Sequence, residues 1–322
     1  MTTAVGFTGA LRRGAVRFSP GDRLGFWLAI APAVLIFGVF TIVPILYVIY
    51  FSFTDYGGFV GVPEFIGLEN YARIFSGDPK IMEALGHTAI YAFFYIVVQI
   101  VLAFLLALLM QSSSRLFVFY RSAFFLPVVI SAVAVVFTWQ FMYDPNTGSI
   151  NAFLRAVGLG ALAQDWLGNY DLALYSVITV DLWRNLGFSL VIFIAGLGTI
   201  PSETIEAARM DGAGPFAMLR HITIPLMRPT FGLVAVLAAN GALRAFDTVY
   251  LMTGGGPGSQ TELYMTLAFD KAFVSKDFGL SSAMSILVVL VLVPLAIMQN
   301  RLGEENRDAR RRGRRIKKEV SA

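Results

Sequence analysis

Residues 201–229, PSETIEAARMDGAGPFAMLRHITIPLMRP, form the stretch on which the interpretation of the whole chain depends. This stretch is neither an apolar span nor an obvious loop. Ser202 suits a helix N-cap, and Glu203 in the first turn complements the helix dipole. Gly212 predicts a left-handed helix stop, and Pro215 predicts the first turn of a second helix. We therefore expect two short helices joined by a glycine hinge.

The composition of the chain is that of a membrane protein. Its 322 residues are 57% hydrophobic and 14% charged, with a mean hydropathy of +0.69. A soluble domain of this length would carry more charge. Cysteine is absent, and the two histidines, His87 and His221, are too few for a histidine-based metal site. We expect an all-α polytopic membrane protein that binds no metal.

Six apolar segments each approach the roughly 20 residues that cross the hydrocarbon core of a bilayer. The six predicted transmembrane helices are residues 24–53, 87–110, 122–143, 172–200, 230–252 and 280–299. Pro127 is expected to interrupt the third of them. A polar N-tail (1–23), a loop (54–86) and a basic C-tail (300–322) lie outside a core that covers 87–299.

The distribution of Lys and Arg orients these spans. Of the 25 such residues, 18 lie in the two tails, in 111–121 and in 201–229, whereas the loops 54–86, 144–171 and 253–279 hold five. The positive-inside rule therefore predicts cytoplasmic N and C termini, a cytoplasmic 201–229 segment and an extracytoplasmic 54–86 loop. The net charge of +4 could suggest nucleic-acid binding, but the basic residues cluster beside apolar spans, and orientation in the bilayer explains them better. No nucleic-acid partner is therefore expected. The basic C-tail is expected to anchor the topology, with binding of anionic lipid or even of nucleic acid as the alternative.

Three short runs within residues 201–229 carry a family resemblance. Glu206-Ala207-Ala208, Asp211-Gly212-Ala213 and Ile222-Thr223-Ile224-Pro225 resemble the EAA loop of bacterial ABC importer permeases of the carbohydrate-uptake group, which includes maltose-type and glycerol-phosphate-type permeases. The resemblance covers roughly 87–299 and the first span. It implies a type I ABC importer permease fold in the bacterial cytoplasmic (inner) membrane. The structural alternative is an amphipathic helix lying on the membrane surface.

The resemblance also implies a set of partners. Residues 201–229 would form a coupling loop on which an ATPase subunit docks. The docking residues would be Glu206, Ala207, Ala208, Asp211, Gly212 and Pro225. The expected partners are a second homologous permease chain, two ATPase subunits, an extracytoplasmic sugar-binding protein and membrane lipids. The sequence contains no Gly-x-x-x-x-Gly-Lys-Ser/Thr phosphate loop and no catalytic set. We therefore expect no enzymatic activity and no cofactor, because ATP would be bound by the partner subunits.

The fourth and fifth predicted spans each contain one arginine. Arg184 and Arg244 are expected at similar depth in the outer half of the bilayer. A charge at that depth is costly unless it is paired or hydrated. Asp181 and Asp247 each lie three residues from an arginine and are expected to share its helical face. Neutralisation of each arginine by its neighbouring aspartate is therefore the alternative to a role in transport.

A translocation path for sugars needs flat apolar faces and hydrogen-bonding groups. The residues expected to supply them are Trp183, Arg184, Asn185, Arg244, Phe246, Asp247 and Tyr250. The favoured function is the permease subunit of an ATP-driven sugar importer. The alternative is a secondary, ion-coupled transporter with Asp181, Arg184, Arg244 and Asp247 as an ion relay, which leaves the 201–229 segment without a role.

Overall fold

The structure is a computed structural model that describes residues 20–58, 61–111 and 114–320. Within those ranges the regular elements are helices, and an isolated β-bridge joins Thr54 to Phe65. The chain divides into two compact units, residues 1–50 and 51–322. The predicted N-tail lies outside the described residues as far as residue 19. The expectation of an all-α chain is confirmed for the described part.

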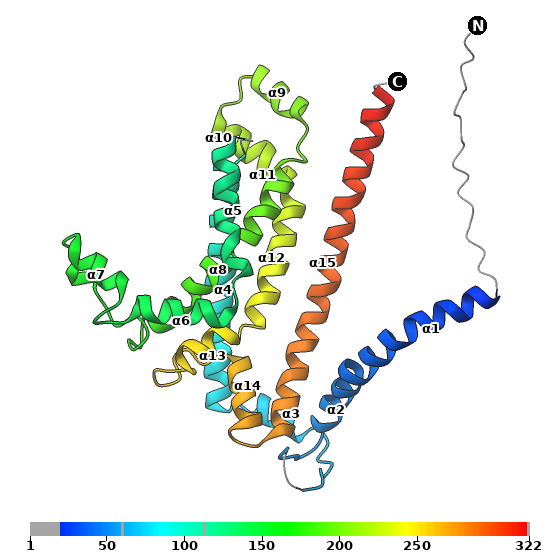
Figure 1. Ribbon diagram of the computed structural model, residues 1–322, viewed down its shortest axis with the longest axis vertical. Coiled ribbons are helices and arrows are strands. Elements are labelled where there is room, and N and C mark those ends of the chain that lie inside the picture. Colours follow the sequence, from blue (N-terminus) through cyan, green and yellow to red (C-terminus); the bar gives the residue numbers. More distant parts are fainter. Residues whose placement is uncertain (1–19, 59–60, 112–113, 321–322) are drawn as a thin grey trace. The chain divides into compact units, whose positions relative to one another are not determined.

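The first unit contains one long apolar helical segment. Helix α1 (Pro20–Phe37) continues through a π-helical turn (Gly38–Ile42) into α2 (Val43–Phe51) (Figure 1). Pro32 lies inside α1 without ending it. The stretch Trp27–Phe51 is long and apolar enough to cross a membrane.

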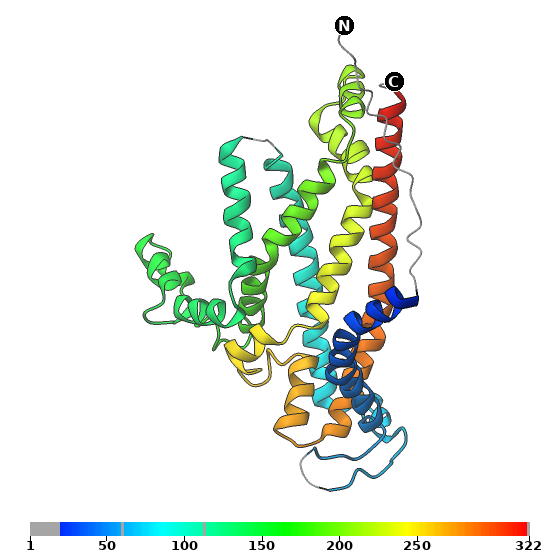
Figure 2. The ribbon, with the colours of Figure 1, turned by 45° about the vertical axis from the view of Figure 1, so that its right-hand side comes forward.

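The second unit contains the remaining helices. They are α3 (Glu69–Phe75), α4 (Pro79–Leu109), α5 (Arg115–Val129), α6 (Ala132–Tyr143), α7 (Ser149–Ala156), α8 (Ala173–Leu197), α9 (Ser202–Met210), α10 (Pro215–Met218), α11 (Ile224–Leu226), α12 (Arg228–Leu243), α13 (Asp247–Thr253), α14 (Tyr264–Phe273) and α15 (Phe278–Val320). Helix α8 packs against α4 and α5, and α12 packs against α4 and α15 (Figure 2). The backbone of the predicted C-tail continues α15 as a helix as far as Val320.

Several helices of the described part could cross a membrane. Four stretches are long and apolar enough, namely Trp27–Phe51, Pro79–Leu109, Ala173–Leu197 and Phe278–Arg301. Two bent pairs of helices are also long and apolar enough when each pair is taken together. They are 115–129 with 132–143, and 215–226 with 228–243. The described residues therefore provide four spans, or six if each bent pair acts as one span.

The predicted third span, 122–143, is not one continuous helix. It is divided between α5 and α6, whose directions differ by 102°. The break falls at Ile130 and Ser131, whereas Pro127 lies inside α5. Ser131 starts the new helix because its backbone is extended and its hydroxyl oxygen accepts a hydrogen bond from the backbone N–H of Ala134 at 3.3 Å.

The predicted fifth span, 230–252, is also broken. Helix α12 ends at Leu243 and α13 begins at Asp247. The backbone between them leaves the helical region, with φ −104° and ψ 7° at Arg244 and φ −145° and ψ −59° at Phe246. Arg244 and Asp247 therefore do not share a helical face, and that part of the neutralisation hypothesis is wrong.

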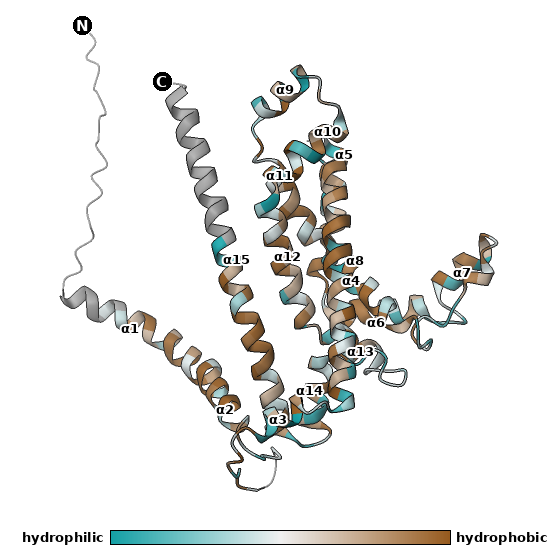
Figure 3. Cartoon of the chain, turned by 180° about the vertical axis from the view of Figure 1, so that it is seen from behind, coloured by the Kyte–Doolittle hydropathy of each residue, from teal (hydrophilic) through white to brown (hydrophobic). Residues whose placement is uncertain are grey.

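Three clusters of buried apolar side chains hold the second unit together. One lies between α4, α6, α8 and α13 and includes Tyr91 and Val177. Another joins α3, α4, α14 and α15 around Ile81 and Met284. The third, around Phe193, lies between α4, α8 and α12. Figure 3 shows polar residues concentrated towards the ends of these apolar helices, including the region of α9 and α10.

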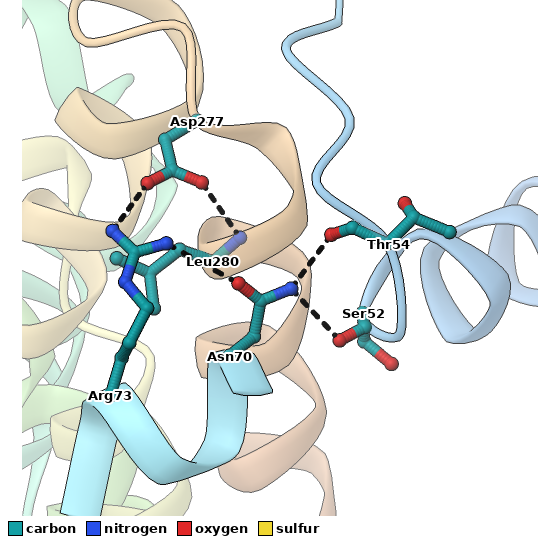
Figure 4. Close-up of polar contacts among 6 residues, drawn as sticks. All are labelled: Ser52, Thr54, Asn70, Arg73, Asp277 and Leu280. Atoms are coloured by element: carbon teal, nitrogen blue, oxygen red, sulfur yellow. Dashed lines mark hydrogen bonds and ion pairs between the residues drawn. The ribbon is translucent and has the colours of Figure 1, made fainter. Parts of the chain in front are cut away.

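Helix α3 ties residues 52–54 to the start of α15 (Figure 4). The buried amide nitrogen of Asn70 donates to the carbonyl oxygens of Ser52 at 3.1 Å and Thr54 at 2.8 Å. Arg73 forms an ion pair with Asp277 at 2.8 Å. The ion pair is partly exposed and is worth no more than about 1 kcal/mol. The buried Asn70 bonds are therefore expected to provide most of this attachment.

Gly187 allows α8 and α5 to approach each other closely. A Cβ atom at Gly187 would lie 2.1 Å from the carbonyl oxygen of Phe124. We expect Gly187→Ala to destabilise the protein by about 1–3 kcal/mol, because the two backbones must separate. Thermal unfolding in detergent measures this, with Gly86→Ala as the control, since no heavy atom lies within 4 Å of a Cβ there. Equal melting temperatures for the two variants would contradict the assignment.

Candidate functional site

The 201–229 segment forms two helices joined by a glycine turn, as predicted. Helix α9 ends at Met210, and Gly212 adopts a positive φ of +80°. Helix α10 then begins at Pro215. The expected capping by Ser202 is wrong, because Ser202 is already the first helical residue and α9 has no side-chain capping hydrogen bond. The positive φ explains why glycine occupies this turn, because residues with a Cβ atom rarely adopt it.

This segment exposes both charged and apolar side chains. Glu206 and Ala207 are exposed on α9, whereas Ala208 is buried. Met210 is 87% exposed and Phe216 is 72% exposed. Met210 and Phe216 are therefore accessible on the surface of this segment.

A cavity of about 460 Å³ lies beneath the two helices of the segment. Its wall combines the ends of α4 and α8 with α9 and α10, and consists of Leu108, Gln111, Leu197, Ile200, Ile205, Arg209, Pro215, Met218, Leu219 and Thr223. The other two residues predicted for docking lie nearby in sequence: Asp211 is exposed at the end of α9, and Pro225 is half-buried in α11.

A second cavity, the charged cavity, has a volume of about 210 Å³ and lies among α4, α8 and the break between α12 and α13. Its lining residues are Tyr91, Tyr95, Asp181, Arg184, Asn185, Gly241, Arg244, Ala245, Phe246, Asp247 and Thr248. Five of the seven residues predicted for the translocation path are therefore brought together in one wall. The formal charges of its two arginines and two aspartates cancel.

Asp181 is the buried centre of this cavity. Its carboxylate accepts a hydrogen bond from the Thr248 hydroxyl at 2.6 Å and another from the Tyr91 hydroxyl. These bonds join α8 to α4 and to the start of α13. A buried carboxylate with two hydroxyl donors is satisfied, and it fixes where α13 begins. The bond to Thr248 thus holds the start of α13 against α8 just after the break.

Among the described residues, the two arginines of the cavity have no direct counter-ion. Arg184 is half-buried and Arg244 is exposed. Within the described part of the chain, neither guanidinium forms an ion pair within 4 Å with Asp181 or Asp247. Asp181 is instead engaged by two hydroxyl groups. Neutralisation by direct contact is therefore not realised, and both arginines remain available to a ligand.

Two of the predicted path residues, Trp183 and Tyr250, are not in the wall of the charged cavity. Trp183 packs edge-on against Trp139, with ring centroids 5.5 Å apart. Tyr250 stacks on Phe246 at 5.1 Å and packs against Phe269 at 4.9 Å. Tyr250 therefore belongs to an aromatic group that adjoins the cavity.

Five residues of the cavity wall were not predicted from the sequence, and three of them, Tyr91, Tyr95 and Thr248, carry hydroxyl groups. Tyr91 and Tyr95 lie one helical turn apart on α4, and their rings stack at 5.9 Å. Two hydroxyl-bearing rings at i and i+4 inside an apolar span were a usable signal for a polar face. Thr248 offered no such signal, since its role depends on Asp181 in a distant helix.

Two carboxyl groups near α14 titrate abnormally. Burial raises the pKa of Glu262, and the neighbouring Asp270 raises it further, while Lys80 lowers it. Burial also raises the pKa of Asp270. Both carboxyls therefore take up protons at a higher pH than freely exposed carboxylates, so negative charge beside α14 decreases as the pH falls.

Known proteins resemble this chain along most of its length. Residues 99–307 match the family described as binding-protein-dependent transport system inner membrane component. The probable ABC transporter permease protein YurN of Bacillus subtilis is 35% identical, over 85% of this chain and 94% of its own length. The trehalose/maltose transport system permease protein MalF of Thermococcus litoralis is 30% identical, over 89% and 95%.

A solved structure shows the same fold. A chain of a bacterial alginate ABC transporter in complex with a periplasmic protein superposes with a TM-score of 0.72 at 19% identity, covering 88% of this chain and 96% of that chain. These similarities do not favour the secondary-transporter alternative. The chain belongs to the binding-protein-dependent transport system inner membrane component family, as a carbohydrate-uptake ABC permease and multi-pass protein of the cell membrane.

Proposed function

We propose that this chain is the permease subunit of an ATP-driven, binding-protein-dependent sugar importer that docks an ATPase subunit through the 201–229 segment. The observation that carries this proposal is the exposure of Glu206, Met210 and Phe216 on two hinged helices between α8 and α12. A protein partner would bury these apolar side chains, while Glu206 adds a charge that can select its orientation.

The proposed topology has six spans, with each bent helix pair counted as one, and both termini in the cytoplasm. The Lys and Arg bias of the sequence supports it. In this topology the 201–229 segment faces the compartment that contains ATP. The tails 1–23 and 300–322 are cytoplasmic, and the loop 54–86 is extracytoplasmic.

The proposed assembly contains a second homologous permease chain, two ATPase subunits and an extracytoplasmic sugar-binding protein. The alginate transporter of similar fold supports the last of these, since it was crystallised with a periplasmic protein. ATP is bound and hydrolysed by the ATPase subunits, and this chain contributes no catalytic group. The charged cavity provides hydrogen-bond donors and acceptors for a sugar on its way through the membrane.

Reconstitution of the complete assembly in proteoliposomes tests this function. The assay measures uptake of radiolabelled maltose, trehalose and glucose, with ATP inside or outside the vesicles. We expect uptake of at least one of these sugars to require both binding protein and ATP on the side of the 201–229 segment, and to persist with a protonophore. Uptake without ATP that the protonophore abolishes would support the ion-coupled alternative instead.

The two arginines of the charged cavity are expected to be needed for transport. Arg184→Ala or Arg244→Ala should lower uptake about tenfold or more, because each removes a charged hydrogen-bond donor from the path. Assembly, measured by size-exclusion chromatography, should be unaffected. The exposed Arg115 provides the control, and Arg115→Ala should transport normally. If Arg184→Ala and Arg244→Ala both transport like the wild type, these residues are not part of the path.

A further inference from the structure

Helix α6 exposes an apolar stripe along one of its faces. Val133, Phe137 and Phe141, which follow one another at intervals of one helical turn, are 49%, 56% and 78% exposed. The opposite face is packed, since Val135 and Val136 are buried in the cluster between α4, α6, α8 and α13. Residues four apart in a helix share a face, so the three exposed side chains form one surface, the α6 stripe.

Hydrogen bonds fix α6 to the rest of the second unit. The side-chain amide of Gln140 donates to the carbonyl oxygens of Leu251 at 3.1 Å and Met252 at 3.0 Å, at the end of α13. The buried hydroxyl of Tyr143 donates to the carbonyl oxygen of Ser176 on α8 at 3.2 Å. Both bonds tie the second half of α6 to a neighbouring helix, so the α6 stripe is presented by a folded surface.

The bend before α6 lies at a depth within the bilayer. Helix α5 starts at Arg115, in the segment 111–121 that the charge distribution places in the cytoplasm, and has 15 residues. It is therefore about 22 Å long, less than the roughly 30 Å thickness of the hydrocarbon core. Helix α6 then turns away by 102° (Figure 1). The bend and the start of α6 consequently lie inside the hydrocarbon and not at the outer membrane surface.

The backbone at this bend is not helical. Ile130 and Ser131 are extended, with ψ of 139° and 144°. Peptide groups at helix ends lack partners within the helix, and lipid offers none, so irregular backbone at this depth is covered by protein or borders water. Val129 and Ser131 are exposed on this chain, so the cover comes from outside it. The apolar stripe that follows favours protein over water.

We propose that the α6 stripe and the bend before it form the contact surface for the second homologous permease chain. The proposal rests on the function and the topology proposed above. A partner that reaches this depth must itself span the membrane, which excludes the ATPase subunits and the extracytoplasmic sugar-binding protein. Within a bilayer, helices associate mainly through van der Waals packing, and the rings of Phe137 and Phe141 offer large surfaces for it.

Photo-cross-linking in the complete transporter identifies what covers the stripe. The photoreactive amino acid p-benzoylphenylalanine is incorporated in place of Phe137 during co-expression of all subunits, and the attached molecule is identified by mass spectrometry after irradiation. Phe93 on α4 is the control position, since it is 61% exposed. It lies two residues from both Tyr91 and Tyr95 and therefore points away from the α8 side of α4. We expect position 137 to capture the second permease chain and position 93 not to capture it.

A packing variant tests the same surface without a probe. The double variant Phe137→Ala and Phe141→Ala should lower the amount of second permease chain that co-purifies with this chain about threefold or more, because most of the contact surface is lost. The amount of this chain in the membrane should stay at the wild-type level, since both side chains are exposed. Phe93→Ala is the matched control and should co-purify normally.

Four results would overturn this interface. They are capture of lipid alone or of another subunit at position 137, equal capture of the second permease chain at position 93, wild-type co-purification of the double variant, and loss of the double variant from the membrane. Absence of a second permease chain from the purified transporter would refute the proposed assembly, and the interface would fall with it. Capture as expected in a transporter without ATP-dependent sugar uptake would support the interface and refute the proposed function alone.

Discussion

Replacing Gly212 by valine is expected to lower ATP-coupled sugar uptake about tenfold, while the chain still inserts into the membrane. Gly212 has a φ of +80°, a conformation that costs a residue with a Cβ about 1–2 kcal/mol and a β-branched residue more. No heavy atom lies within 4 Å of a Cβ at this position, so the penalty comes from the backbone alone. A different turn would separate Glu206 on α9 from Phe216 on α10, and the ATPase would lose one of its two contacts.

Two matched variants separate this effect from a general defect. Gly214 lies two residues further on, has a φ of −70° and has equally open surroundings, so Gly214→Val should remain close to wild type. Gly212→Asn should retain most of the activity, because asparagine tolerates positive φ. Uptake and ATPase pull-down are measured for all three variants. Wild-type values for Gly212→Val in both assays would remove the turn from the coupling mechanism.

Replacing Asp181 by alanine is expected to damage both stability and transport. Asp181 accepts hydrogen bonds from Tyr91 and Thr248, and its removal leaves two buried hydroxyls without their acceptor. Each such group costs about 1–3 kcal/mol, so the melting temperature in detergent should fall clearly. The start of α13 also loses its link to α8, and we expect uptake to fall at least about tenfold because the cavity wall moves.

Two controls accompany this variant. Asp181→Asn keeps one oxygen acceptor of the same shape and should lose less stability than Asp181→Ala. Asp171, exposed in the loop before α8, carries the same charge, and Asp171→Ala should melt like the wild type. The account of the cavity would be contradicted if Asp181→Ala melted at the wild-type temperature.

The local features of this chain were predictable from its sequence. The helix stop at Gly212 and the new helix at Pro215 depend on the backbone preferences of those two residues. The long apolar helices α4 and α8 were predicted for a similar reason, since their apolar stretches are continuous over the length of a span. The cavity residues Arg184 and Arg244 were identified because charge inside an apolar span is costly wherever it occurs.

Two breaks within the predicted spans were not placed correctly, one for a local reason and one that depends on a distant contact. The break before α6 falls at Ser131 because its hydroxyl caps a new helix, whereas the sequence pointed to Pro127. The break before α13 brings Thr248 to Asp181, 67 residues earlier in the chain. That break removes Arg244 and Asp247 from a common helix. Phe246, beside the break, packs against Phe269 on α14, with ring centroids 5.0 Å apart.

Docking of an ATPase on the 201–229 segment is the central claim, and site-directed photo-cross-linking tests it most directly. The chain contains no cysteine, so Met210→Cys, at an 87% exposed position on α9, introduces its only thiol. That thiol is labelled with benzophenone maleimide in the assembled transporter and irradiated, and the attached protein is identified by mass spectrometry. Phe153→Cys on α7, at a 65% exposed position outside the segment, is the control. We predict that the Met210 adduct captures the ATPase subunit and the Phe153 adduct does not. Capture of the sugar-binding protein or of lipid alone by the Met210 adduct would contradict the account.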